Sequence, residues 1–101
     1  MPKRGRADLH MHTTASDGWP DPHQLVEHAS SIALNVIAVT DHDTIEGALR
    51  AADHAGTRLE VVIGEEVSSR DGHIVAVFPT DIAPMDARVI DAIVKELAPA
   101  E

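Results

Sequence analysis

Residues 35–44 read Asn-Val-Ile-Ala-Val-Thr-Asp-His-Asp-Thr, and this stretch decides the fold class. The near-continuous β-branched run at 36–40 is typical of a strand that is buried on both faces of a parallel sheet. Polar residues follow at once, which indicates that the strand ends there and a loop begins. Since parallel sheets gather functional side chains where strands end, these ten residues predict a buried strand with a candidate site beside it.

Shorter apolar runs on both sides supply three more strands. We expect them at residues 7–11, 59–63 and 73–78, and the central strand at 35–40. Residues 68–72 read Ser-Ser-Arg-Asp-Gly, which is turn chemistry, so the last strand should form a hairpin with a strand extended through Val67.

The first of three expected helices starts at Pro22. Asp21 can cap it, and Gln24 stands three residues after the cap, which is the spacing of a capping box. Its apolar stripe should be Leu25, Ala29, Ile32 and Ala33.

The second helix should begin near Asp43 or Thr44, with Glu46 in a capping box and Gly56 at the C-terminal turn. Its buried face is predicted to be Ile45, Ala48, Leu49 and Ala52. The third helix is expected at residues 86–97, with an inward stripe of Val89, Ile90, Ile93, Val94 and Leu97. Strands alternating with helices indicate an α/β fold with parallel pairings and one hairpin.

Composition limits the chemistry that the chain can perform. The 101 residues fit one domain, and the absence of cysteine excludes disulfides and thiolate nucleophiles, so any metal must bind histidine and carboxylate. A net charge of -9 argues against broad nucleic-acid binding. We expect a basic, solvated tail at residues 1–6, with Lys3, Arg4 and Arg6, and a domain at 7–98. No run is apolar enough for a signal or a membrane span, which favours a cytoplasmic protein without a membrane partner.

Histidines and carboxylates stand near one end of every expected strand. His10 and His12 share a strand face and could chelate a cation, or could be two half-exposed strand residues. Asp17 lies in the polar turn at 14–18, where it could bind metal or simply stabilise the backbone. His42 lies between Asp41 and Asp43, which suits a ligand whose ring is oriented by neighbouring carboxylates.

Two more candidates follow the later strands. Glu65 and Glu66 are adjacent, so strand alternation places only one of them toward a site, and His73 opens the last strand. Such groups crowded at one end of a sheet would form an acidic site that divalent cations stabilise. The sequence therefore predicts a multinuclear metal site.

Five segments in this order and spacing resemble the N-terminal motifs of the polymerase and histidinol phosphatase (PHP) family: residues 8–13, 16–18, 39–44, 64–68 and 72–74. The chain looks most like the stand-alone phosphoesterases of the family, which include 5'-3' exonuclease-like and nucleotide phosphatase members. The resemblance implies a distorted (β/α)7 barrel of TIM-like type, of which this chain supplies about four strands and three helices.

The resemblance also implies the site. Two or three divalent ions (zinc, manganese or iron) would be held by His10, His12 and Glu66 at the first ion, Asp17 and His42 at the second, and Glu66 with His73 at the third. Asp41 and Asp43 would support these ligands without binding metal. A metal-bound water would act as the nucleophile on a phosphate ester of a nucleotide, short oligonucleotide or other phosphorylated small molecule.

The sequence also allows alternatives to this function. The family's later Gly-Gly-x-x-x-x-x-His-Pro-like and Ser-Asp-x-His-like motifs are not among the 101 residues, so the chain could be a truncated fragment. After that explanation come completion of the barrel by a second copy or a companion chain, and then metal binding without turnover. The early His-x-His also allows an amidohydrolase-like hydrolase.

Four further residues lie outside the motifs or at their border. Trp19 follows the turn with Asp17, where loop packing or base stacking would explain it. The remaining histidines are expected on helix surfaces: His23, His28 and His54.

Overall fold

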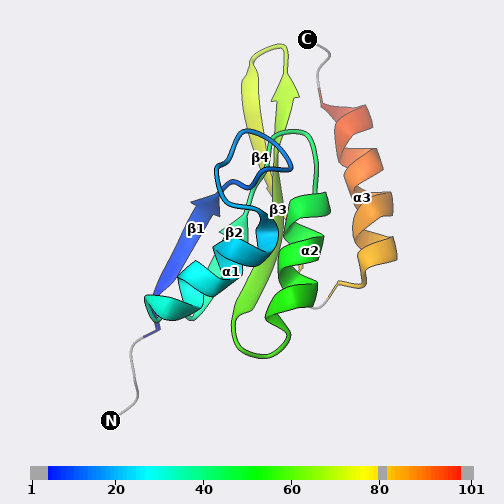
Figure 1. Ribbon diagram of the computed structural model, residues 1–101. Helices are drawn as coiled ribbons and strands as arrows, with labels where there is room; N and C mark the ends of the chain where they lie inside the picture. Colours follow the sequence, from blue (N-terminus) through cyan, green and yellow to red (C-terminus); the bar gives the residue numbers. More distant parts are fainter. Residues whose placement is uncertain (1–4, 80–81, 99–101) are drawn as a thin grey trace.

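The computed structural model describes residues 5–79 and 82–98 of the chain (Figure 1). Its elements are β1 (Ala7–Met11), α1 (Pro22–Ser31), β2 (Val36–Val39), α2 (Glu46–Ala55), β3 (Glu60–Ser69), β4 (Gly72–Val77) and α3 (Pro84–Leu97). Lys3 and Arg4 of the expected basic tail lie outside the described residues. Within the described ranges, no helix has the length and apolar character that a bilayer crossing needs.

One four-stranded sheet has the order β1-β2-β3-β4. The first three strands are parallel, and β3 and β4 form the antiparallel hairpin that the sequence predicts. Figure 1 shows α1 and α2 side by side across one face of the sheet, with α3 next to α2. The parallel strands therefore end together, at the edge where the loops after β1 and β2 lie, and the α/β fold is confirmed.

The hydrophobic core lies between the sheet and the two helices that cover it. The central strand β2 is buried along nearly its whole length, as its β-branched sequence predicts. Each buried Val or Ile contributes about 1.5–3 kcal/mol relative to an exposed one. The fully buried members of this core are Val26, Ala29, Ile37, Val39, Ala51 and, from α3, Ala87.

Helix α1 begins as predicted but ends earlier. The Asp21 side chain accepts a hydrogen bond from the Gln24 backbone N–H at 2.8 Å, and the Gln24 side chain accepts one from the Asp21 N–H at 3.0 Å. The helix stops at Ser31, because Ala33 adopts a left-handed φ of 61°. The predicted burial of Ile32 and Ala33 is therefore wrong, since both are exposed beyond the helix end.

Helix α2 starts later than predicted, at Glu46 rather than near Asp43 or Thr44. Asp43 has a left-handed φ of 57°, which is incompatible with a helical turn at that residue. The predicted capping box is also wrong, because the Glu46 carboxylate accepts two hydrogen bonds from Arg88 of α3, at 2.9 and 3.1 Å. The C-terminal turn at Gly56 is confirmed.

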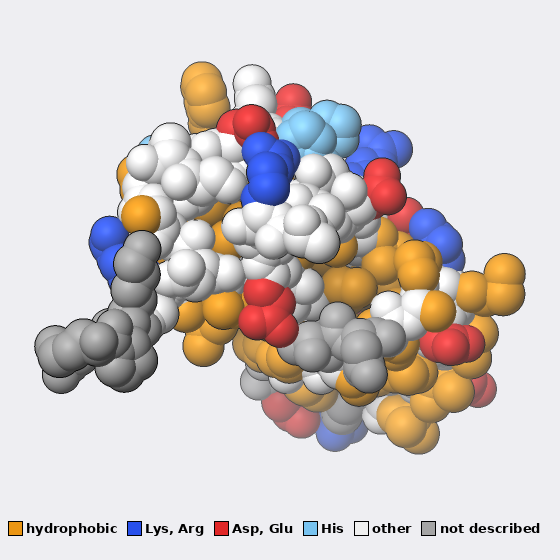
Figure 2. All heavy atoms as spheres, turned by 90° about the horizontal axis from the view of Figure 1, so that it is seen from below, with side chains coloured by type: hydrophobic (Ala, Val, Ile, Leu, Met, Phe, Trp, Pro, Cys, Tyr) orange, Lys and Arg blue, Asp and Glu red, His pale blue; other side chains and the backbone are white. Residues whose placement is uncertain are grey.

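Helix α3 forms, but its predicted inward stripe is wrong. Its buried residues are Ala87 and Asp91, whereas the large apolar side chains are exposed: Val89, Ile90, Ile93 and Leu97. Figure 2 shows hydrophobic side chains gathered on the side of the molecule that carries α3. Lys95 instead lies between two buried carboxylates at the contact with the sheet, Asp91 of its own helix and Glu65 of β3. An amphipathic pattern identifies an apolar face, but not which face packs on the sheet.

Candidate metal centre

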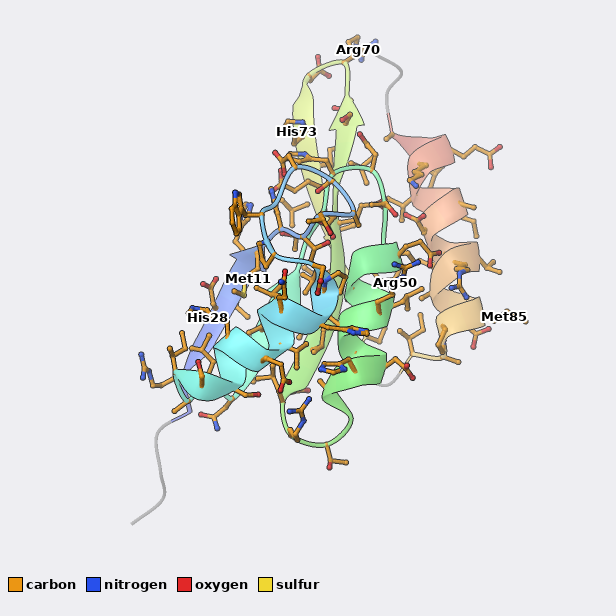
Figure 3. All side chains as sticks on the ribbon, viewed as in Figure 1. Met11, His28, Arg50, Arg70, His73 and Met85 are labelled. Carbon is orange, nitrogen blue, oxygen red and sulfur yellow. The ribbon has the colours of Figure 1, made fainter. Side chains whose placement is uncertain are left out.

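Six predicted ligands meet at the carboxyl ends of the parallel strands. β1 and the loop after it supply three of them, the loop after β2 supplies one, and the β3–β4 hairpin supplies two: His10, His12, Asp17, His42, Glu66 and His73. Figure 3 labels His73 on β4, beside the loop that follows β1. The topology therefore gathers residues that are up to 63 positions apart in the chain.

Glu66 lies at the centre of this cluster. Its Oε1 pairs with Nε2 of His10 and lies 2.9 Å from Nε2 of His12, while its Oε2 lies 3.5 Å from Nδ1 of His42. Burial acts to raise the pKa of Glu66, but the hydrogen bond with His12 and the three imidazoles hold it below its ordinary value. Glu66 therefore stays ionised at neutral pH.

The backbone explains why Glu66 and His42 face one another. The pairing of β2 with β3 continues past the end of β2 as an isolated parallel bridge between these two residues. The Glu66 N–H donates to the Asp41 carbonyl at 2.9 Å, and the Asp43 N–H donates to the Glu66 carbonyl at 3.0 Å. The side chains of His42 and Glu66 therefore extend from neighbouring strands at paired positions.

His12 is held between two carboxylates. Its Nδ1 lies 2.8 Å from Asp17 Oδ1 while its Nε2 faces Glu66, and the other Asp17 oxygen lies 3.2 Å from Nε2 of His42. Burial acts to lower the pKa of His12, but the hydrogen bonds to Glu66 and Asp17 raise it above the ordinary value. The hydrogen bond from His12 in turn lowers the pKa of Asp17.

The six residues form three groups whose donor atoms lie within 4.8 Å of one another. The first group is the one expected for a single ion, the second gains His12 beside Asp17 and His42, and the third gains His42 beside Glu66 and His73. The groups are His10–His12–Glu66, His12–Asp17–His42 and His42–Glu66–His73. Four imidazoles and two carboxylates are a donor set that fits zinc, manganese or iron.

Asp41 is fully buried and holds the loop after β1 in place. Its Oδ1 accepts from the Thr13 N–H at 2.6 Å and from the Ser16 hydroxyl at 2.7 Å, and its Oδ2 accepts from the Thr13 hydroxyl at 2.7 Å. The prediction that Asp41 orients the His42 ring is wrong, because its carboxylate supports the loop that carries Asp17. Thr13 was not predicted, and its one sequence signal is its position directly after His12.

The Asp43 carboxylate likewise forms its hydrogen bonds with another residue and not with the His42 ring. Its carboxylate accepts from the Ser68 N–H at 2.7 Å and from the Ser68 hydroxyl at 2.6 Å. These bonds lower the pKa of Asp43. Asp43 thus ties the loop that carries His42 to β3, two residues beyond Glu66.

The loop after β1 turns back closely against the strand. A Cβ at Gly18 would lie 2.4 Å from the carbonyl carbon of His12, so only glycine fits there. The next residue, Trp19, is 92% exposed. Packing of this side chain against the loop, one of the two interpretations that the sequence allows, is therefore wrong.

Glu65 points to the opposite face from Glu66, which answers the question that strand alternation left open. Glu65 is fully buried under α3, with Lys95 Nζ 3.3 Å from its Oε2. Burial and the nearby Asp91 carboxylate raise the pKa of Glu65 to about 8, against the lowering effect of Lys95. Glu66, which the resemblance implied as the ligand, is the one at the cluster.

The helix histidines lie apart from the cluster, as expected. His23 and His28 are exposed, and His54 is partly exposed. The rings of His23 and His54 stack with centroids 4.2 Å apart, and His54 Nε2 lies 3.2 Å from Glu27 Oε2. Within the described part of the chain, none of the three donor groups includes them.

Known proteins are similar to this chain in sequence and in fold. The chain is 46% identical over 65 residues to a 5'-3' exoribonuclease of Haemophilus influenzae, a match that covers 61% of this chain and 23% of that protein. The structure superposes on an amidohydrolase from Chromobacterium violaceum, solved with sulfate and no metal, with a TM-score of 0.67 and 33% identity, covering 88% of this chain and 33% of that one.

A candidate metal-dependent phosphoesterase from Bifidobacterium adolescentis is similar as well, with a TM-score of 0.61 and 32% identity over 74% of this chain and 27% of that one. The chain thus spans between about a quarter and a third of the length of these relatives. The sequence model of the PHP domain matches residues 8–93. With the motifs, the fold and this match in agreement, the chain belongs to the PHP domain family.

Proposed function

We propose that the chain carries ligands of a PHP-type phosphoesterase that hydrolyses phosphate esters of nucleotides or short oligonucleotides with two or three divalent ions. The observation that carries this proposal is the convergence of six ligands into three overlapping groups. The descriptions of two relatives, an exoribonuclease and a candidate phosphoesterase, support the reaction class. Zinc, manganese and iron all suit these donor atoms, so the identity of the metal stays a prediction.

Charge supports a phosphate substrate. Asp17 and Glu66 are the two anionic members of the six-ligand set. Two divalent ions would outweigh these two carboxylates and make the loaded site attractive to a phosphate, although the whole chain is acidic. When bound, such ions supply water with a pKa near 7 and stabilise the attacking and leaving oxygens.

The protein's own contribution is to keep the ligands in the right protonation state. Asp17 and Glu66 stay ionised because their pKa values are lowered. His12 must lose its proton before it can bind metal, and its pKa is raised above 6.5. Metal affinity and the metal-dependent rate should therefore fall as the pH drops through this raised pKa.

The test is hydrolysis of a generic phosphoester and of a 5'-phosphorylated oligonucleotide with added manganese or zinc. We expect activity that a chelator removes and that weakens below neutral pH. His10→Ala should lower it by about 100-fold or more, since even residues that only support ligands cost 10–100-fold. The matched control is His28→Ala, at an exposed position of α1, which should leave the activity unchanged. Activity that is indifferent to the chelator would contradict the proposal, and bound metal without turnover would restrict it to metal binding.

Features of the structure bear on two of the alternative functions. An amidohydrolase-like activity is not favoured, because the Thr-Asp-His-Asp element that it leaves unexplained supplies His42 to two of the three donor groups. Association with a second copy or a companion chain stays a prediction. The group of exposed apolar side chains on α3 favours it, since an exposed apolar patch is typical of contact sites.

A further inference from the structure

Trp19 has the most exposed of the large apolar side chains in the described part of the chain, and it stands two residues after the candidate ligand Asp17. It is 92% exposed, whereas the other aromatic residue of the chain, Phe78, is 4% exposed and part of the core. Tryptophan buries more apolar area than any other residue when it packs, so leaving it in water forgoes a large stabilisation. Such exposure next to a candidate site indicates a binding role.

The loop around Trp19 is closed by hydrogen bonds on both sides. The Thr14 N–H donates to the Pro20 carbonyl at 2.9 Å, and the Gly18 N–H donates to the Thr13 carbonyl at 2.8 Å. Ser16 adds its bond to buried Asp41. The backbone that carries Trp19 is thus fixed before any ligand arrives, which lowers the entropic cost of using the side chain for binding.

The same loop also carries a ligand of the metal centre. Asp17, two residues before Trp19, faces His12 and His42, and Gly18 lies directly against the backbone of His12. Two residues of extended chain span at most about 7 Å between Cα atoms. The Trp19 backbone therefore lies within that distance of a candidate ligand, close enough for its long side chain to reach a base attached to a phosphate at the site.

We propose that Trp19 stacks on the nucleobase of the substrate and makes the site prefer nucleotides over sugar phosphates. The proposal rests on the function proposed above, because it places the phosphate at the six-ligand cluster. A nucleotide joins a phosphate to an aromatic base through a sugar, which matches an anion site with an exposed indole within reach. Stacking on an aromatic side chain is worth roughly a 5- to 150-fold gain in affinity per base.

Trp19 is the sole tryptophan of the chain, so its fluorescence reports on this contact alone. We would titrate the manganese-loaded protein with adenosine 5'-monophosphate and with ribose 5-phosphate, and follow binding independently by broadening of the ligand phosphorus resonance. Adenosine monophosphate should quench the fluorescence and bind at least about 5-fold more tightly. Ribose 5-phosphate should bind without quenching.

Variants then test the same preference without fluorescence. Trp19→Ala should remove the preference for the nucleotide, Trp19→Phe should keep part of it, and Ile32→Ala, which removes an exposed apolar side chain at the far end of α1, should leave it unchanged. Nucleotide that binds without quenching, or a preference that survives Trp19→Ala, overturns the stacking proposal alone. Failure of both ligands to bind overturns it as well. Quenching with no metal-dependent hydrolysis supports stacking and overturns only the proposed reaction.

Discussion

Glu66→Gln is expected to remove metal from the site while leaving the fold intact. Glu66 belongs to two of the three donor groups and is the carboxylate on which His10, His12 and His42 converge. Glutamine has nearly the same shape but no charge, so it cannot offset a divalent cation among three imidazoles. We expect metal affinity to fall by about 100-fold or more and metal-dependent hydrolysis to be lost.

Calorimetric titration with zinc and elemental analysis after gel filtration measure this loss, and circular dichroism checks the fold. The matched control is Glu60→Gln, the same substitution on an exposed residue at the opposite end of β3. It should bind metal as the unaltered protein does. Equal metal content in the two variants would contradict the assignment of Glu66.

Gly47→Ala should destabilise the protein strongly, although alanine is the better helix former. A Cβ at Gly47 would lie 2.2 Å from Asp41 Oδ2 and 2.4 Å from Thr13 Oγ1. It would therefore break the buried hydrogen bonds that hold the loop after β1. Overpacking costs about 1–3 kcal/mol and a buried group left without its partner about as much again, so we expect a loss of roughly 2–6 kcal/mol.

Urea denaturation of the metal-free protein gives this free energy of unfolding. Gly5→Ala is the control, because its added methyl group meets nothing closer than 3.9 Å. If helix propensity decided the outcome instead, Gly47→Ala would be up to about 1 kcal/mol more stable than the unaltered protein. That result would show that the contact of α2 with Asp41 is not tight.

The strands and the metal ligands could be predicted from sequence because both depend on local signals. A β-branched run predicts a buried strand, and candidate ligands of a parallel sheet follow the strand ends, so these signals predict His42 and one member of the pair Glu65 and Glu66 near the site. The family resemblance implies that this member is Glu66. Strand alternation could not choose between Glu65 and Glu66. That choice depends on which face α3 covers, which no local pattern encodes.

The errors concern residues whose partners are distant in sequence. The sequence predicts a helix start near Asp43, but Asp43 bonds to Ser68, 25 residues away. It also predicts that Asp41 orients the His42 ring, but Asp41 bonds to Thr13, 28 residues away. The stripe of α3 predicts an apolar face, yet Asp91 is what that helix buries. Hydrophobic periodicity gives the face of a helix, while tertiary pairing decides where that face points.

The central claim is that one end of the sheet binds divalent metal through four of the seven histidines. Long-range proton–nitrogen NMR spectra of the imidazoles, recorded as zinc is added to the metal-free protein, test it with internal controls. The resonances that we expect to shift are those of His10, His12, His42 and His73, and those that should stay in place belong to His23, His28 and His54. If the first four do not respond in the folded protein, or the helix histidines bind the zinc, the metal centre described above is wrong.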